Sequence, residues 1–154
     1  MKLYLVRHGQ TDWNKEKRLQ GQEDIPLNDF GRHLAKETGI GLRNVRFDLC
    51  FSSDLKRALE TANLILDEGS NKVPIIMDKR LKEIAFGEWE GKSVARNQME
   101  VPDEFLKFYD DPEHFAGAPG GESFAEVKER TDNFLKWLVG QEEYGPFLEY
   151  YGLY

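Results

Sequence analysis

The chain begins with a short apolar run that stops at chemically active side chains. Residues 3–6 read Leu-Tyr-Leu-Val and are followed by Arg7, His8 and Gly9. Such a run predicts a buried β-strand, and open α/β sheets bind their ligands at the carboxyl ends of strands. We therefore expect Arg7 and His8 beside a ligand, with Gly9 allowing the backbone to approach it closely. From these residues alone, a first strand with a solvated Arg-His end is the alternative.

Strand and helix patterns follow one another along the rest of the chain. Residues 12–22 are polar and are predicted to form a loop. Buried strands are predicted at residues 47–51 and 74–77, and helices at about 55–66, 103–109 and 123–139. The last helix is expected to turn these side chains inward: Phe124, Val127, Thr131, Phe134, Leu135 and Leu138. The residues Ser52-Ser53-Asp54 form a cluster of types favoured at helix N-caps, and we expect them to cap the helix over 55–66.

A further helix is predicted to begin after Asn28, a residue type favoured at the N-cap. Gly31 and Gly39 should weaken this helix somewhat. Its apolar residues near one face are Leu34, Ile40 and Leu42.

Composition limits what the protein can do. The length of 154 residues predicts a single domain over 1–154, and a formal net charge of −7 argues against nucleic-acid and anionic-membrane partners. The one cysteine, Cys50, lies in an apolar run, where a buried inert thiol is expected. We find neither a signal peptide nor a transmembrane run, so we expect a cytoplasmic protein. His8, His33 and His114 lie far apart, so no metal site is predicted.

Three motifs in order resemble those of the histidine phosphatase superfamily, which includes the cofactor-dependent phosphoglycerate mutases. They are Arg-His-Gly-Gln-Thr at 7–11, Ser-Asp-Leu-Lys-Arg-Ala at 53–58, and the stretch at 81–91 that contains Glu83. The resemblance covers about residues 1–140 and leaves 141–154 as an atypical tail. It implies an α/β three-layer sandwich, with a mostly parallel central sheet flanked by helices and with C-terminal strands missing or replaced.

The resemblance also implies a role for each motif residue. His8 would be the nucleophile, and Glu83 the proton donor; Glu88 and Glu90 are rivals of Glu83 on chemistry alone. The phosphate ligands it implies are Arg7, Asn14, Gln20, Gly21 and Arg57. Neither a cofactor nor a metal is implied. The alternative to phosphate binding is a solvated charge on a helix for Arg57, and for Asn14 it is a role in forming a turn.

One feature of the resembled family has no counterpart in the sequence. The family places a second histidine on a strand after the long last helix, whereas His33 falls inside a predicted helix and His114 in a proline-rich connector. We expect both to be surface or capping residues. The missing strand should leave an apolar groove or a free sheet edge, unless residues 147–154 fill it, and such an edge favours association.

These observations predict a phosphoric monoester hydrolase that acts on small phosphorylated metabolites through a phosphohistidine, with activity reduced by the absent histidine. The alternatives are a non-catalytic phosphate-binding protein or inactive partial form, and a phosphoglycerate mutase. The expected partner is a small phosphate ester, and the expected state is a monomer or a homodimer.

Overall fold

The structure is a computed structural model that describes residues 2–70, 72–140 and 149–150. Its strands form two parallel pairs, β1 with β4 and β2 with β3. Leu3 lies opposite Tyr150 in the first pair, and Cys50 opposite Ile75 in the second. The strands are β1 (Lys2–Leu3), β2 (Cys50–Ser52), β3 (Ile75–Met77) and β4 (Glu149–Tyr150). The predicted α/β class with parallel strands is confirmed.

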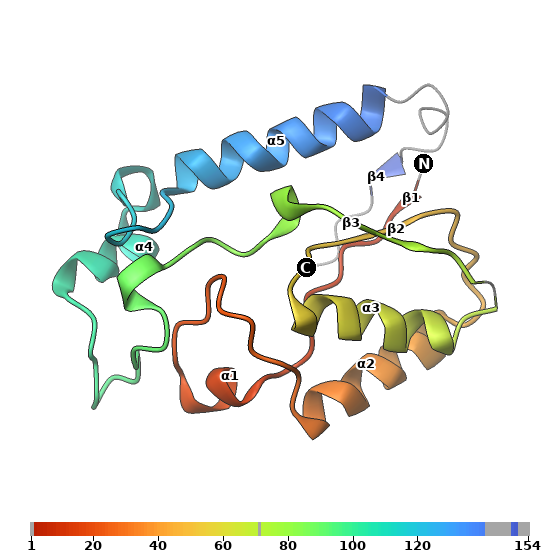
Figure 1. Cartoon of the computed structure of the whole chain (residues 1–154), viewed down its shortest axis with the longest axis horizontal. Coiled ribbons are helices and arrows are strands. Elements are labelled where there is room, and N and C mark those ends of the chain that lie inside the picture. Colours follow the sequence, from red (N-terminus) through yellow and green to blue (C-terminus); the bar gives the residue numbers. More distant parts are fainter. Residues whose placement is uncertain (1, 71, 141–148, 151–154) are drawn as a thin grey trace.

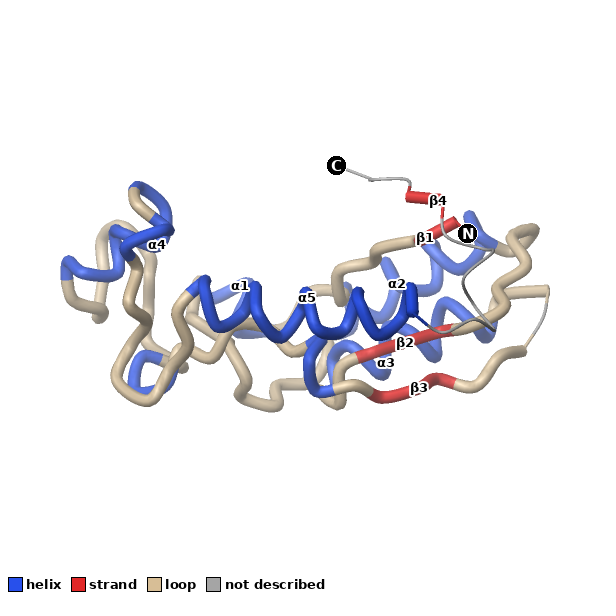
Figure 2. The backbone as a smooth tube through the Cα atoms, turned by 90° about the horizontal axis from the view of Figure 1, so that it is seen from above, coloured by secondary structure: helices blue, strands red, loops and turns tan. Residues whose placement is uncertain are grey.

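Helices cover both faces of the strands (Figures 1 and 2). α2 and α3 pack together on one face, and α5 lies across the other. The α-helices are α1 (Asp12–Glu16), α2 (Asp29–Leu42), α3 (Lys56–Asp67), α4 (Lys107–Asp110) and α5 (Phe124–Gly140). Short 3₁₀ turns are η1 (Lys79–Leu81), η2 (Gly87–Trp89), η3 (Asp103–Leu106) and η4 (Pro112–His114). The arrangement is the three-layer order expected from the sequence.

The first strand is shorter and more exposed than predicted. Only residues 2–3 of the expected run pair with another strand, while Leu5 is 57% and Val6 50% exposed. A cavity of about 960 Å³ lies beside this segment and is lined by β1 and β2 on opposite sides. Burial of residues 5 and 6 would require a neighbour in that space, and the expectation that residues 147–154 fill it falls on a segment that lies almost wholly outside the described residues.

A hydrophobic core lies away from the strands. Aromatic rings pack against one another in it, including Phe105 stacked on Phe108 with centroids 5.5 Å apart. Its buried residues are Leu19, Ile84, Phe86, Trp89, Val101, Phe105, Phe115 and Ala118. This core fixes the connections between β3 and α5, which reach across the molecule below α5 in Figure 1.

The helix predicted after Asn28 is present, but it buries a different face. The Asn28 side chain accepts a hydrogen bond from the Gly31 amide at 2.9 Å, as an N-cap should. The expected apolar face is wrong, because Leu34 and Ile40 are 42% and 41% exposed. The buried residues are instead Gly31, Ala35 and Gly39, which allow close backbone contact with the loop after β1 and with α3.

Three other helical predictions need correction. Residues 12–16 form α1 rather than loop, because Thr11 and Asn14 make a reciprocal capping box. The cluster at 52–54 does not cap α3; the carboxylate of Asp24 accepts from the first amide of that helix, at Lys56, at 2.7 Å. In α5, Leu135 is 43% exposed, whereas Phe134 and Leu138 are buried as predicted.

The cysteine and the two histidines that were expected to lie outside the site are Cys50, His33 and His114. Cys50 is half-buried, and burial raises the pKa of its thiol, as expected of an unreactive cysteine. His33 is exposed on α2, and the exposed His114 lies 2.7 Å from Asp111, so neither belongs to the site around His8. Over the described residues, no helix has the length and apolar character needed to cross a bilayer.

Candidate active site

His8 follows β1 and is held by the backbone beside it. Its Nδ1 lies 2.7 Å from the carbonyl oxygen of Gly9. A carbonyl can only accept, so Nδ1–H donates, and the lone pair of the neutral ring is left on Nε2. The sequence predicted His8 at the carboxyl end of the first strand; β1 ends at Leu3, and His8 lies beyond it, half-buried in the lining of the cavity.

The turn after His8 is fixed by α2 and α3. The Gly9 amide donates to the Thr61 hydroxyl at 3.0 Å, and that hydroxyl donates to the carbonyl of Arg57 at 2.7 Å. A Cβ on Gly9 would lie 2.5 Å from the carbonyl oxygen of Gly31. The sequence indicated a glycine for close approach, and the close neighbour in the structure is the N-terminal turn of α2. Thr61 was missed because a mid-helix threonine carries no distinctive signal.

Arg57 is 1% exposed and comes from the first turn of α3. Its Nη1 donates to the carbonyl of Glu23 at 2.7 Å, and its Nη2 to the carbonyl of Gly21 at 2.6 Å. The buried Nε is without a hydrogen-bond partner among the described residues. Arg57 therefore holds the loop at 20–23 and still presents an unused buried donor, which is costly unless an acceptor binds there. Arg57 is therefore not a solvated charge on the helix surface, which was the alternative role expected for it.

Charged groups converge on His8. Burial lowers the pKa of His8 most strongly, and the positive charges of Arg57 and Arg7 lower it further, against opposing contributions from the Gly9 carbonyl and Glu83. Burial likewise lowers the pKa of Arg57, which still leaves an arginine charged. The lowered pKa favours the neutral imidazole of His8, and Arg7, His8 and Arg57 all line one cavity.

Glu83 is an exposed residue that lines the same cavity. One oxygen, Oε1, accepts from the Ile84 amide at 3.0 Å. The rival Glu90 is fully engaged: its carboxylate accepts from three backbone amides, those of Gln22, Glu23 and Phe86. Glu88 is exposed and is absent from the cavity lining. Of the three carboxylates, the structure brings only Glu83 to His8.

Asn14, Gln20 and Gly21 do not line the cavity. Asn14 Oδ1 accepts from the Thr11 amide at 3.0 Å, and the Thr11 hydroxyl donates to Gln20 Oε1 at 2.7 Å. Gly21 adopts a φ of +50°, and a Cβ there would meet Glu90 Oε1 at 2.3 Å. In the structure these three residues shape the loop that Arg57 holds.

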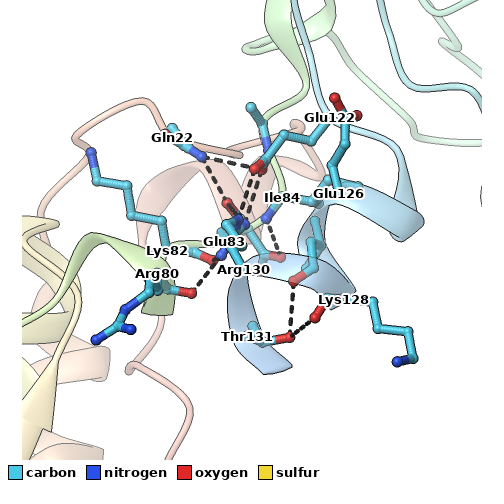
Figure 3. Close-up of polar contacts among 12 residues, drawn as sticks. Gln22, Arg80, Lys82, Glu83, Ile84, Glu122, Glu126, Lys128, Arg130 and Thr131 are labelled. Atoms are coloured by element: carbon cyan, nitrogen blue, oxygen red, sulfur yellow. Dashed lines mark hydrogen bonds and ion pairs between the residues drawn. The ribbon is translucent and has the colours of Figure 1, made fainter. Parts of the chain in front are cut away.

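A network that sequence reasoning missed anchors the segment carrying Glu83 (Figure 3). Arg130 of α5 donates to the carbonyls of Arg80 and Lys82, both at 2.8 Å, and to that of Glu83 at 3.1 Å. Glu122 pairs with Arg130 at 2.7 Å and also accepts from the Ala85 amide at 2.9 Å. The hydrogen bonds from Arg130 lower the pKa of Glu122 and outweigh its burial.

The signal for this network is weak in the sequence. Glu122 lies in the Gly-Gly-Glu-Ser turn at 120–123, but Arg130 is one of several charged residues on α5. Only the packing of α5 beside η1 aligns Arg130 with three carbonyls of the segment at 80–83. The described residues contain no group of three or more side chains able to hold a metal ion.

Fold and site together define an α/β domain with parallel strands and a cavity whose lining includes His8, Arg7 and Arg57. The chain belongs to the histidine phosphatase superfamily, branch 1, whose family model matches residues 3–148. The solved structure of Bacillus stearothermophilus YhfR superposes with a TM-score of 0.78 at 37% identity, over 90% of this chain and 67% of that one.

Curated relatives with phosphatase names are also similar. Fructose-2,6-bisphosphatase TIGAR of Xenopus tropicalis is 40% identical over 139 residues, 88% of this chain and 49% of the relative. Glucosyl-3-phosphoglycerate phosphatase of Mycolicibacterium vanbaalenii is 37% identical over 142 residues, 92% of this chain and 61% of the relative. The chain thus spans about half to three-fifths of the length of these relatives.

Proposed function

We propose that the protein is a phosphomonoesterase acting on small phosphorylated metabolites, with His8 as its nucleophile. The observation that carries this is the state of the His8 ring: its Nδ1 is committed to the Gly9 carbonyl, and burial beside two arginines favours the neutral form. The free Nε2 lone pair can attack phosphorus. The P–N bond forms as the P–O bond to the leaving alcohol breaks.

The two arginines supply the charge that such a step needs. Arg7 is exposed at the strand end, whereas Arg57 is buried with one unused donor. Forked guanidinium donors match the geometry of phosphate oxygens and stabilise the charge spread over them. Asn14, Gln20 and Gly21 would then support this binding indirectly, by fixing the loop that Arg57 grips.

Glu83 is the proposed acid. It would donate a proton to the leaving oxygen and afterwards accept one from the water that cleaves the phosphohistidine, returning His8 to its neutral form. Its exposed position on the cavity wall allows contact with bulk water. The relatives that carry phosphatase names act on phosphorylated sugars and glycerates by those names, which supports this substrate class.

Hydrolysis of p-nitrophenyl phosphate tests the proposal. We expect measurable turnover by the intact chain, loss of turnover in His8→Ala, and loss of at least about tenfold in Glu83→Gln, the range typical of acid–base groups being about 10²–10⁴. Glu88→Gln is the matched control and should retain activity. Isomerisation of 3-phosphoglycerate without hydrolysis would instead indicate a mutase.

A non-catalytic phosphate-binding protein is the second candidate, favoured by the surface positions of His33 and His114, which leave His8 as the one histidine at the cavity. Acid-labile, base-stable labelling of His8 by a phosphodonor separates the two. No label on folded protein that still binds phosphate would establish the binding function and overturn the enzymatic one.

A further inference from the structure

We propose that Thr61 is a positioning residue for His8: its hydroxyl anchors the Gly9 amide and thereby holds the imidazole with Nε2 free for attack. Three hydrogen bonds in series connect α3 to the ring, from the Arg57 carbonyl through Thr61 and Gly9 to His8. The catalytic consequence rests on the proposed function, whereas the state of the ring can be measured without turnover.

The direction of each hydrogen bond follows from the groups involved. The Arg57 carbonyl can only accept, so the single proton of the Thr61 hydroxyl is donated to it at 2.7 Å. A lone pair of that hydroxyl oxygen then accepts from the Gly9 amide at 3.0 Å. The Gly9 carbonyl in turn accepts from Nδ1 of His8 at 2.7 Å. The hydroxyl therefore acts as donor toward α3 and as acceptor toward the turn that carries His8.

Gly9 needs an anchor from outside its own backbone. Glycine has wide conformational freedom, so its carbonyl has no strongly preferred direction. A residue with a Cβ is not a substitute, because that atom would lie 2.5 Å from the Gly31 carbonyl oxygen. The peptide is held from both sides instead: Thr61 binds the Gly9 amide, and the Asn28 amide donates to the carbonyl of Gln10 at 3.0 Å. These two contacts aim the Gly9 carbonyl at Nδ1.

The burial of Thr61 distinguishes this role from simple packing. Thr61 is 5% exposed and lies one helical turn after Arg57, which is 1% exposed. The same turn of α3 thus directs the Arg57 guanidinium to the cavity and its carbonyl to Thr61. A buried amide is costly to leave without an acceptor, so the hydroxyl fixes Gly9, and with it His8, relative to Arg57. A residue that only filled this space could be a valine.

Thr61→Val is the test variant, because it removes the hydroxyl and keeps the branched shape. With the Gly9 carbonyl no longer aimed at Nδ1, the neutral His8 ring should populate the tautomer with its proton on Nε2, which has no lone pair there for attack. The kcat for p-nitrophenyl phosphate should fall by at least about tenfold, within the roughly 10²-fold that misplacement of a reacting group can cost. KM should stay within about twofold, since both arginines are retained.

Nitrogen NMR of the His8 ring, recorded above its titration midpoint, identifies the tautomer directly. In the parent chain the proton should lie on Nδ1, and in Thr61→Val a measurable share should move to Nε2. Hydrogen exchange at the Gly9 amide should become at least about tenfold faster in the same variant. Thr61→Ser keeps the hydroxyl and should restore the parent tautomer, exchange rate and kcat.

Thr38→Val is the matched control. Thr38 lies inside α2, is exposed, and donates to the carbonyl four residues earlier, that of Leu34, at 2.9 Å. Its loss should leave the His8 tautomer, Gly9 exchange and kcat unchanged. Circular dichroism establishes that each variant is folded, and Thr61→Ala, which also lacks the hydroxyl, replaces Thr61→Val if that variant unfolds.

Two outcomes would overturn the proposal. The first is a parent ring that carries its neutral-state proton on Nε2. The second is an unchanged tautomer and unchanged Gly9 exchange in the folded variant without the hydroxyl, even if kcat falls. The expected tautomer response in a chain without turnover would instead sustain the positioning role of Thr61 and contradict the proposed hydrolase.

Discussion

His8 and Arg57 illustrate how neighbours give a single residue its chemistry. Each lies beside an element boundary, His8 after β1 and Arg57 in the first turn of α3. The backbone carbonyls around them fix which atoms remain available, namely Nε2 of His8 and Nε of Arg57. Sequence could identify the two residues as candidates, but their available atoms follow from contacts with Gly9, Gly21 and Glu23.

The lowered pKa of His8 makes a prediction about pH. Between the ordinary value of 6.5 and the lower pKa of the folded state, this histidine is mostly protonated in the unfolded chain and mostly neutral in the folded protein. The unfolded state then binds more protons, so the free energy of unfolding falls as pH decreases from 6.5 toward the folded pKa. NMR titration of the His8 ring should give a midpoint below 6.5.

The stability consequence is measured by urea denaturation across the same pH range. His8→Gln should lose less stability than the parent chain between pH 6.5 and the measured midpoint, since it removes the group responsible. An NMR midpoint at or above 6.5 would contradict both the pKa direction and the neutral nucleophile built on it.

At the scale of elements, α2 is organised around glycine contacts rather than an apolar stripe. Gly31 and Gly39 weaken the isolated helix, yet they let its backbone approach the loop after β1 and the α3 helix. Local propensity and packing therefore oppose each other at these positions, and the packing prevails. The effects of packing and of helix propensity can be measured separately, because α2 contains a third glycine, Gly41, which packs against no other described element.

Gly31→Ala should destabilise the protein by about 1–3 kcal/mol, the usual cost of overpacking. A Cβ there would lie 2.2 Å from the carbonyl oxygen of Gln10. Gly41→Ala is the matched control: apart from its chain neighbours and the backbone of its own helix, no described heavy atom lies within 4 Å of its Cβ position. It should stabilise the protein by about 0.5–1 kcal/mol through helix propensity alone. Equal effects in thermal unfolding would refute the packing explanation.

The contacts of α5 with the segment at 80–85 lead to a second prediction about the elements. Arg130→Met removes three carbonyl contacts and the partner of Glu122, and should cost about 2–4 kcal/mol in the free energy of unfolding. Lys128→Met, which removes an exposed pair with Asp132, should cost less than about 0.5 kcal/mol.

The positioning role of Arg130 needs a readout beyond stability. Hydrogen exchange at residues 82–85 should rise in Arg130→Met under conditions where the protein stays folded, and remain unchanged in Lys128→Met. Unaltered exchange in this segment would mean that Arg130 only adds to global stability. Turnover, where present, should fall with the loss of order at Glu83.

At the scale of the whole molecule, stability is distributed unevenly. The aromatic core around Phe105 lies outside the strands, whereas the strand pairs border a cavity of about 960 Å³. Local opening is easiest where few apolar contacts must be broken. The two ends of the molecule should therefore open with different free energies.

Native-state hydrogen exchange measures this difference. Backbone amides of residues 84–89, next to the core, should exchange more slowly than those of residues 4–6, which border the cavity. Uniform protection across both regions would indicate that the cavity wall is as stable as the core.

The sequence alone was sufficient for the α/β class and the family, because each depends on local patterns: an apolar run, a cap, a motif. It predicted the wrong buried face for α2 and the wrong cap for α3, because both depend on contacts between residues far apart in the chain. Asp24, for example, caps α3 from 32 positions before Lys56. The network of Arg130 and the engagement of Glu90 were likewise decided by tertiary packing. Hydrogen-bond partners and shared cavities depend on distances in space, which residue spacing along the chain does not specify.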